Sequence, residues 1–264
     1  MRRFTIALVP LALIGLAIIQ LDAQSPAGQS LTIAAASDLQ AVFPEIAGRF
    51  ERQSGTKTTV SFGSSGNFFA QIQNGAPFDL FFSADVNYPR QLIAAGHADQ
   101  DSLYEYASGR LVVWTRKDSG IDISRGLLSL LDARVRRIAI ANPQLAPYGR
   151  AAQAALKQAG VFDAVQSKLV RGENISQTAQ LADSGNAQVG LIALSLALGP
   201  VLQASGRYVE IPETAHPPLE QAAVIVSGAR NKTAAKAFVA FLQRPETNQL
   251  LQRFGFTPAA SPVP

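Results

Sequence analysis

The sequence predicts an α/β fold, and three observations lead to that expectation. Segments rich in β-branched and aromatic residues alternate with segments whose apolar residues recur at helical spacing. Several of the helix-like segments end at a glycine, as helices commonly do. The chain has 264 residues, 47% of them hydrophobic, which is enough for one large domain or two lobes. Strands that alternate with helices of 10 to 15 residues are typical of parallel sheets covered by helices.

Each expected helix is supported by an apolar face and a defined end. In residues 39–55 the apolar side chains share one face, Pro44 falls near the first turn, and Gly55 marks the end. Further helices are expected over 66–77, 86–96, 148–160, 175–186 and 231–255. The expected strands are 31–36, 56–63, 79–84, 110–118, 137–143, 208–213 and 221–228. The run 188–198 is mostly apolar and its pattern does not separate helix from strand, whereas 259–264 is expected to be a loose tail.

The first 23 residues have the pattern of an export signal. Two arginines precede an apolar run of 16 residues, and a small-residue cleavage site follows at Ala23. A membrane anchor is the alternative, but the run contains Pro10 and is short for a span of about 20 residues. The chain has no cysteine that could carry a lipid or form a disulfide. The mature protein is therefore expected to have no membrane anchor and to depend on its core for stability.

Charge and motifs exclude several functions. The net charge of +4 is small for this length and the basic residues are scattered, so nucleic-acid binding is not indicated. The common dinucleotide, P-loop, zinc-protease and nucleophile-elbow motifs are absent. His97 and His216 are the only histidines and lie in loop-like segments, so a zinc site is not expected. Asp79 and Asp85, which flank LFFSA, are interpreted as turn and cap residues rather than as metal ligands.

Two similar junctions remain, AAASDL and FGSSGNF, each placing serines where a strand gives way to a helix. A helix N-terminus carries unpaired N–H groups and a partial positive charge, and therefore can bind an anion. Serine is also a common N-cap, so one such turn indicates no more than a capped helix. Two of them in consecutive units, among alanines and glycines, favour an anion site made of neutral donors.

The chain resembles the periplasmic molybdate-binding proteins of ABC importers. Four motifs carry the resemblance, which extends over roughly residues 30 to 258: TIAAASDLQAVFPEIAGRFERQSG, VSFGSSGNFFAQIQNGAPFDLFFSAD, IAIANPQLAPYGRAAQAAL and RFGFTP. It implies a type II periplasmic binding fold, with two α/β lobes, a hinge of two crossing segments and an oxyanion cleft between the lobes. From it we expect lobe 1 to comprise residues 30–108 plus 218–258, and lobe 2 to comprise residues 109–217.

The resemblance also implies which groups of lobe 1 contact the ligand. Ser37 of AAAS and Ser65, the second serine of GSSG, match the family's two hydroxyl donors. Main-chain N–H groups of Asp38 and of Asn67 or Gly66 are expected to assist. The carboxylate of Asp38 should turn away from an anion and cap its own helix, because it would repel the anion.

In lobe 2 the resemblance implies two further contacts and one departure. Tyr148 matches a position that contributes a main-chain N–H in some members and a tyrosine hydroxyl in others. Ile175 matches an apolar residue that contributes its main-chain N–H at a helix start. Some members have a ligand-binding tyrosine where this chain has Ala193. We expect the hydroxyl of Tyr148 to replace it.

A site made only of donors suits a fully deprotonated tetrahedral dianion, whose oxygens are acceptors only. Molybdate and tungstate are therefore the expected ligands, held as oxyanions without protein–metal bonds and without a cofactor. Phosphate near neutral pH carries a proton that would lack an acceptor, at a cost of about 1–3 kcal/mol. The protein is expected to be a periplasmic monomer that delivers its ligand to an ABC permease and catalyses nothing.

Three alternatives stay open. The same fold could bind sulfate or another oxyanion, which only the size of the site would exclude. A secreted serine hydrolase using Ser64 or Ser65 is a different class, and the shortage of histidines counts against it. The effector-binding lobes of a transcription regulator share this fold, but the export signal and the lack of a DNA-binding segment disfavour that function.

Overall fold

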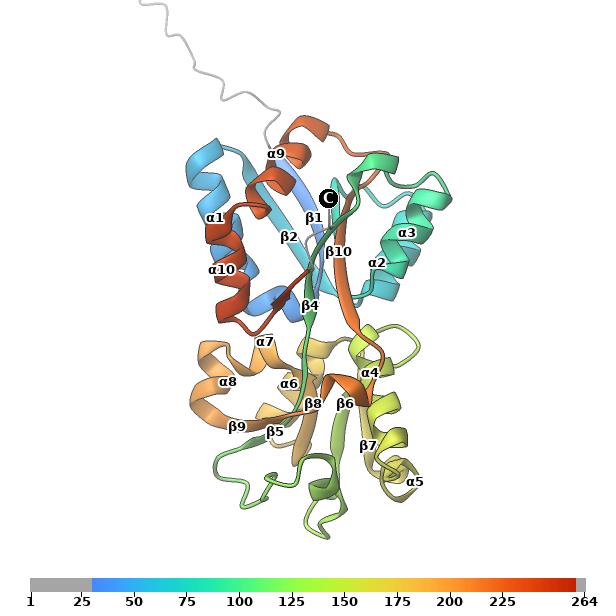
Figure 1. Ribbon diagram of the computed structural model, residues 1–264, viewed down its shortest axis with the longest axis vertical. Coiled ribbons are helices and arrows are strands. Elements are labelled where there is room, and N and C mark those ends of the chain that lie inside the picture. Colours follow the sequence, from blue (N-terminus) through green and yellow to red (C-terminus); the bar gives the residue numbers. More distant parts are fainter. Residues whose placement is uncertain (1–29, 260–264) are drawn as a thin grey trace, which may run out of the picture.

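Two β-sheets, each flanked by helices, lie one beyond the other along the long axis of the molecule (Figure 1). The computed structural model describes residues 30–259. The predicted export signal, residues 1–23, lies outside the described residues, as does 260–264 of the predicted tail.

Lobe 1 is built around a six-stranded sheet in the order β11-β4-β10-β3-β1-β2. Its strands are β1 Ser30–Ala36, β2 Lys57–Gly63, β3 Leu80–Ser83, β4 Tyr104–Gly109, β10 Leu219–Ile225 and β11 Thr257–Pro258. Its helices are η1 Ser37–Ala41, α1 Phe43–Ser54, α2 Ser65–Gln73, α3 Asn87–Ala94, η2 Gln100–Ser102, α9 Lys232–Leu242 and α10 Pro245–Arg253.

Lobe 2 is built around a five-stranded sheet in the order β7-β6-β8-β5-β9. Its strands are β5 Leu111–Arg116, β6 Ile138–Ala141, β7 Leu169–Gly172, β8 Val189–Ala193 and β9 Gly206–Glu210. Its helices are η3 Gly126–Leu131, α4 Pro147–Gln158, α5 Phe162–Val165, η4 Gln166–Lys168, α6 Ile175–Asp183, α7 Leu194–Ala197, α8 Pro200–Ser205 and η5 Glu213–Ala215.

The sheets are mixed, which corrects the expectation of purely parallel sheets. β1 pairs in parallel with β2 and β3, and β6 pairs in parallel with β7 and β8. By contrast, β10 is antiparallel to β3 and β4, and β5 is antiparallel to β8 and β9. β5 and β10 are the strands by which the chain enters a lobe from the other one. Because no helical crossover precedes them, as parallel pairing would require, they pair antiparallel with their neighbours.

The chain passes between the lobes at two places (Figure 1). β4 of lobe 1 runs through Arg110 into β5 of lobe 2, and β9 of lobe 2 returns to lobe 1 as β10. The two crossings contact each other, because Leu219 of β10 lies opposite Gly109 of β4. This pair of adjacent segments is the hinge region of the structure.

Several elements differ from their sequence-based predictions. The expected helix 39–55 is split into η1 and α1, with Pro44 near the start of α1. The expected helix 231–255 is split before Pro245, which starts α10 because proline suits a first helical turn but not a helix interior. The run 188–198 divides into β8 and α7. Strands β4, β7 and β11 were not predicted.

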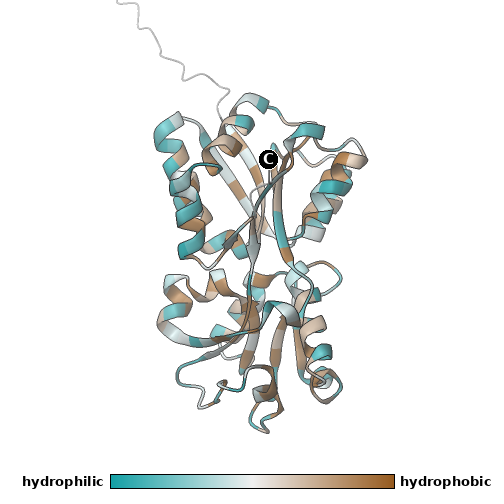
Figure 2. Ribbon diagram, in the orientation of Figure 1, coloured by the Kyte–Doolittle hydropathy of each residue, from teal (hydrophilic) through white to brown (hydrophobic). Residues whose placement is uncertain are grey.

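Lobe 1 has one apolar cluster on each face of its sheet, and most of lobe 2 packs in a third. Hydrophilic residues are frequent along the outer helices (Figure 2). In lobe 1, Phe43 lies 5.0 Å from Phe82 and 5.8 Å from Phe238, measured between ring centroids. These contacts fix α1 and α9 against the same face of the sheet. The strand ends that face lobe 2 are thereby held in place.

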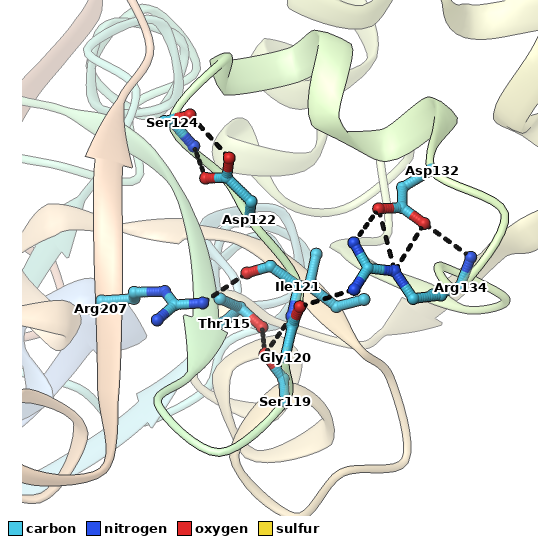
Figure 3. A network of polar contacts seen from close by, with 9 residues as sticks. All are labelled: Thr115, Ser119, Gly120, Ile121, Asp122, Ser124, Asp132, Arg134 and Arg207. Carbon is cyan, nitrogen blue, oxygen red and sulfur yellow. Dashed lines mark hydrogen bonds and ion pairs between the residues drawn. The ribbon is translucent and has the colours of Figure 1, made fainter.

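A network of hydrogen bonds and ion pairs holds the long connection between β5 and β6 against lobe 2 (Figure 3). Arg134 pairs with Asp132 and also donates to the Gly120 carbonyl at 2.9 Å. Arg207 of β9 donates to the Ile121 carbonyl at 2.5 Å. The network stabilises lobe 2 and uses none of the predicted site residues.

Candidate functional site

Four helix N-termini meet at one small pocket between the lobes. Ser37 is the first residue of η1 and Ser65 the first of α2, both from lobe 1. Tyr148 is the second residue of α4 and Ile175 the first of α6, both from lobe 2. Each of these four residues is at most 3% exposed. Because the first N–H groups of a helix have no partner within it, the pocket is surrounded by potential main-chain donors and positive helix ends.

The pocket is compact and has no cationic side chain in its lining. About 10 Å³ of it is open to the centre of a water molecule, close to what one buried water requires. Its lining consists of Ala36, Ser37, Asp38, Gly63, Ser64, Ser65, Ala84, Ala146, Pro147, Tyr148 and Ile175. Asp38 is the only charged group among them. A tetrahedral oxyanion is larger than one water molecule, so the lobes must separate slightly to hold one here. Apart from the Asp38 carboxyl, the polar groups that would face it are neutral donors.

Strand register explains why the two serine motifs lie side by side. β1 and β2 are parallel neighbours, and Ala36 lies opposite Gly63. The residues that follow, at the start of η1 and just before α2, must therefore emerge at the same edge of the sheet. β3 is also parallel to β1, and the chain just after it supplies Ala84. Carboxyl ends of parallel strands are where α/β proteins commonly bind ligands.

The two serines of GSSG have different roles. The Ser64 side chain caps α2 by accepting a hydrogen bond from the Asn67 N–H at 3.3 Å. Ser65 Oγ accepts from the buried Ala84 N–H at 3.0 Å. That bond fixes the oxygen and leaves the hydroxyl proton of Ser65 available to a ligand in the pocket.

Ser37 joins the lobes directly. Its hydroxyl donates to Asn174 Oδ1 at 3.2 Å and accepts from the Ser176 N–H at 3.3 Å, and both partners belong to lobe 2. Asn174 also caps α6, because its Oδ1 accepts from the Gln177 N–H at 2.9 Å. The hydroxyl of Ser37 thus lies against the start of α6, where Ile175 presents its main-chain N–H.

Tyr148 points its hydroxyl away from a potential ligand. The hydroxyl donates to Asp38 Oδ2 at 3.1 Å, which uses its one proton. The N–H of Tyr148 lies in the first turn of α4, where no helical partner exists. Of the two contacts considered for this residue, the arrangement favours the main-chain N–H. The expected exchange of a tyrosine hydroxyl for Ala193 is not supported, because Ala193 does not line the pocket.

The Asp38 carboxylate makes its main hydrogen bonds with a network at the hinge, which was not expected. The N–H groups of Asp38 and Leu39 at the start of its own helix also favour the charged form, as in the expected cap, but contribute less. Asp38 Oδ2 accepts from Gln221 Nε2 at 2.5 Å as well as from Tyr148. Gln221 of β10 in turn accepts from the Tyr106 hydroxyl at 2.7 Å. The Asp38 carbonyl accepts from Ser195 Oγ at 2.7 Å. The first turn of η1 is therefore connected to both hinge segments.

Burial dominates the electrostatics of this network. Asp38 is fully buried, and burial raises the pKa of its carboxyl to about 6, although hydrogen bonds from Gln221 and Tyr148 favour the charged form. Asp38 Oδ1 has no hydrogen-bond partner of normal geometry. Burial also raises the pKa of Tyr148 and of Tyr106 well above the usual value, so both hydroxyls stay protonated. The carboxyl of Asp38 is thus the one group of the pocket that titrates near neutral pH.

Two main-chain groups expected to assist are already paired. The N–H of Gly66 donates to the Leu145 carbonyl of lobe 2 at 2.9 Å. The N–H of Asn67 is taken by Ser64, and Asn67 does not line the pocket. A Cβ on Gly66 would lie 2.6 Å from the Leu145 oxygen, so glycine is what allows the two lobes to approach here.

Sequence reasoning missed the groups that form the hinge side of the site. Ser195 stands alone among apolar neighbours in LIALSLAL, and an isolated polar residue in a buried segment could have indicated a buried hydrogen bond. Gln221 follows Glu220 and precedes AAVIV, so it looked like the polar start of a strand. Ala84 and Gly63 at the strand ends carried no such signal. No cluster of three or more His, Asp or Glu residues suited to a metal exists in residues 30–259. Within that range no helix has both the length and the apolar character needed to span a membrane.

The chain is similar to known proteins over most of its length. Residues 31–257 match the family described as bacterial extracellular solute-binding protein. The molybdate-binding protein ModA of Azotobacter vinelandii is 36% identical over 224 residues, covering 85% of this chain and 88% of that protein. The protein of the same name from Rhodobacter capsulatus is 35% identical over 232 residues, covering 88% and 90%. A solved structure, the Azotobacter vinelandii periplasmic molybdate-binding protein, matches with a TM-score of 0.82 and 32% identity, covering 87% of this chain and all of that one.

Proposed function

The chain belongs to the family of bacterial extracellular solute-binding proteins, and we propose that it binds molybdate, and with comparable affinity tungstate, for an ABC importer. The observation that carries the proposal is the convergence of four helix N-termini, with the hydroxyls of Ser37 and Ser65, on a buried pocket without cationic side chains. We further propose that the protein acts as a monomer in the periplasm after its export signal is removed.

The donor set explains why an oxyanion would be preferred. A tetrahedral dianion carries four oxygens that only accept hydrogen bonds. The pocket can offer the hydroxyl of Ser65 and the main-chain N–H groups of Tyr148 and Ile175. The Ser37 hydroxyl adds a further donor when its proton turns from Asn174 Oδ1 to the ligand. Hydrogen bonds to a charged acceptor are stronger than neutral ones, and in a buried site water does not compete for them. No cofactor is needed for this chemistry.

Lobe closure connects binding to transport. Donors come from both lobes, so a bound oxyanion stabilises the form in which the lobes are in contact. The Gly66 N–H to Leu145 carbonyl bond and the Ser195 to Asp38 carbonyl bond, at 2.9 and 2.7 Å, exist only in that form. The membrane permease would recognise the closed protein and receive its ligand.

Catalysis by Ser64 or Ser65 is less well supported. A serine hydrolase needs a base beside its nucleophile, usually a histidine. Neither His97 nor His216 lines the pocket. Ser64 accepts from Asn67 and Ser65 accepts from Ala84, so neither contacts a basic side chain.

Calorimetric titration with a panel of oxyanions at equal ionic strength tests the function. We expect one molybdate per chain, tungstate within about tenfold, and sulfate weaker by at least about tenfold. A sulfate ion has shorter bonds, so fixed donors cannot all reach it, and each lost hydrogen bond costs about 1–3 kcal/mol. Phosphate is informative because Asp38 could accept its proton. Sulfate or phosphate binding as tightly as molybdate would refute the assignment.

The same titration should depend on pH through Asp38. Its pKa of about 6 means that the carboxyl is mostly ionised at pH 8 in the empty protein. A dianion in the pocket disfavours that charge, so binding above pH 6 takes up a proton. Molybdate affinity should therefore fall as pH rises from 6 to 8, by at most about tenfold per unit. The variant Asp38→Asn should lose this dependence, and an equal slope in both proteins would exclude Asp38 as its source.

A further inference from the structure

An ion pair beside the anion pocket joins the two lobes. Arg150 lies in α4 of lobe 2, and Asp85 follows β3 of lobe 1. We propose that Arg150, Asp85 and Tyr88 form a latch that keeps the cleft closed and sets the rate at which the ligand leaves. The proposal rests on the proposed function, because it concerns the same cleft. Arg150 is a positioning residue in this scheme, since it does not line the pocket.

The guanidinium of Arg150 makes three contacts with lobe 1. One nitrogen pairs with Asp85 Oδ2 at 2.5 Å and another donates to the Tyr88 hydroxyl at 3.2 Å. The guanidinium carbon also lies 5.5 Å from the centroid of the Tyr88 ring. Exposed ion pairs contribute little to stability, but this one combines charge, a hydrogen bond and a cation–π contact. Its side chains are 39% and 22% exposed for Arg150 and Asp85, so it is partly shielded from solvent.

Contacts within lobe 1 already orient the Asp85 side chain toward Arg150. Its Oδ1 accepts from the main-chain N–H and the side-chain amide of Asn87, both at 2.9 Å. This is the turn role expected from the sequence, and it leaves Oδ2 directed to Arg150. Only Oδ2 therefore changes partner when the lobes separate. A group already oriented in one lobe loses little side-chain entropy when the other lobe arrives.

The position of the latch couples it to the pocket wall. Asp85 directly follows Ala84, whose N–H binds Ser65 Oγ. Arg150 is two residues after Tyr148 at the start of α4. Within residues 30–259, this is the one ion pair whose partners come from different lobes. The cleft cannot open to release a ligand unless this ion pair breaks. A ligand that binds to the open form meets no such pair, so the pair should affect dissociation more than association.

The test compares Arg150→Met with Arg90→Met. Arg90 of α3 pairs with Glu105 of β4 at 2.7 Å, entirely inside lobe 1, so both variants lose one charge and one ion pair. Release of radiolabelled molybdate is measured after a chase with unlabelled molybdate, and association is measured separately. We expect Arg150→Met to release molybdate about tenfold faster with association changed less than about twofold, because the pair joins the two lobes only in the closed form and therefore acts on dissociation. Arg90→Met should match the wild type.

A double-mutant cycle with Asp85→Asn completes the test, since asparagine keeps the Oδ1 acceptor for Asn87. The double variant should release molybdate no faster than Arg150→Met alone, and added salt should speed release from the wild type but not from the variant. Unchanged release from Arg150→Met, equal acceleration in Arg90→Met, or a change confined to association would overturn the latch. Failure of the wild type to bind molybdate would instead refute the proposed function.

Discussion

Replacing Gly66 with alanine is expected to weaken molybdate binding by about 100-fold while the protein stays folded. The added Cβ would lie 2.6 Å from the Leu145 carbonyl oxygen and 2.9 Å from the Tyr88 hydroxyl. Leu145 belongs to lobe 2, and its oxygen accepts the Gly66 N–H, so the main chain cannot move aside without losing that bond. Overpacking of this kind costs about 1–3 kcal/mol, and 100-fold corresponds to roughly 2.7 kcal/mol.

The clash with Leu145 exists only when the lobes are closed, because Leu145 belongs to lobe 2. The contact with the Tyr88 hydroxyl lies within lobe 1 and is relieved by a small movement at the end of that side chain. Gly66 lies in the first turn of α2, where alanine is a better helix former. Thermal unfolding of the empty variant should therefore be unchanged or slightly raised. Gly48→Ala is the matched control, since its Cβ would meet only an arginine side chain at 3.4 Å. Wild-type affinity in Gly66→Ala would mean that the bound form does not bring Gly66 against Leu145.

Removing the Ser65 hydroxyl should cost both affinity and stability. The variant Ser65→Ala loses a donor to the ligand and leaves the buried Ala84 N–H without its partner. Each loss is worth about 1–3 kcal/mol, so affinity should fall by roughly 5- to 150-fold and the free energy of unfolding should fall by a similar energy. Ser37→Ala should weaken binding within the same range. Calorimetry and denaturant unfolding measure the two effects separately.

The neighbouring serine provides the control. Ser64 caps α2, so Ser64→Ala should lower stability by about 1 kcal/mol and leave affinity nearly unchanged. The contrast between adjacent serines distinguishes ligand contact from helix capping. If Ser64→Ala weakened binding more than Ser65→Ala, the roles of the two serines would be reversed.

The sequence was sufficient to predict the two-lobed α/β fold and the family, because both depend on patterns that span the chain. The positions of Ser37 and Ser65 followed from the same reasoning. Each ends a strand and begins a helix, and the parallel register of β1 and β2 brings such positions together. Local signals and the resemblance agreed at these residues.

The hydrogen-bond partners at the site could not be predicted, because they depend on how the lobes meet. The Asp38 carboxylate had a local alternative in its own helix, yet it bonds Gln221 and Tyr148, which are 183 and 110 residues away along the chain. The N–H groups of Gly66 and Asn67 matched the expected motif but have protein partners.

Strand β4 was missed for a similar reason. YEYASG contains a glutamate and a glycine, which weaken a strand signal. The glycine is explained by the hinge, since a Cβ on Gly109 would lie 2.1 Å from the Tyr148 hydroxyl. Its neighbour Tyr106 is buried by the same network. At Gly109, therefore, the residue that the contact between the lobes requires is one that weakens the strand signal.

The central claim is that molybdate binds where the four helix N-termini meet. A crystal structure of the mature protein with molybdate, using the anomalous signal of molybdenum, tests it most directly. The account predicts one strong peak in the pocket, with oxygens about 2.7–3.2 Å from the hydroxyls of Ser37 and Ser65 and from the N–H groups of Tyr148 and Ile175. A principal peak elsewhere, or one contacted by an arginine or lysine side chain, would contradict it.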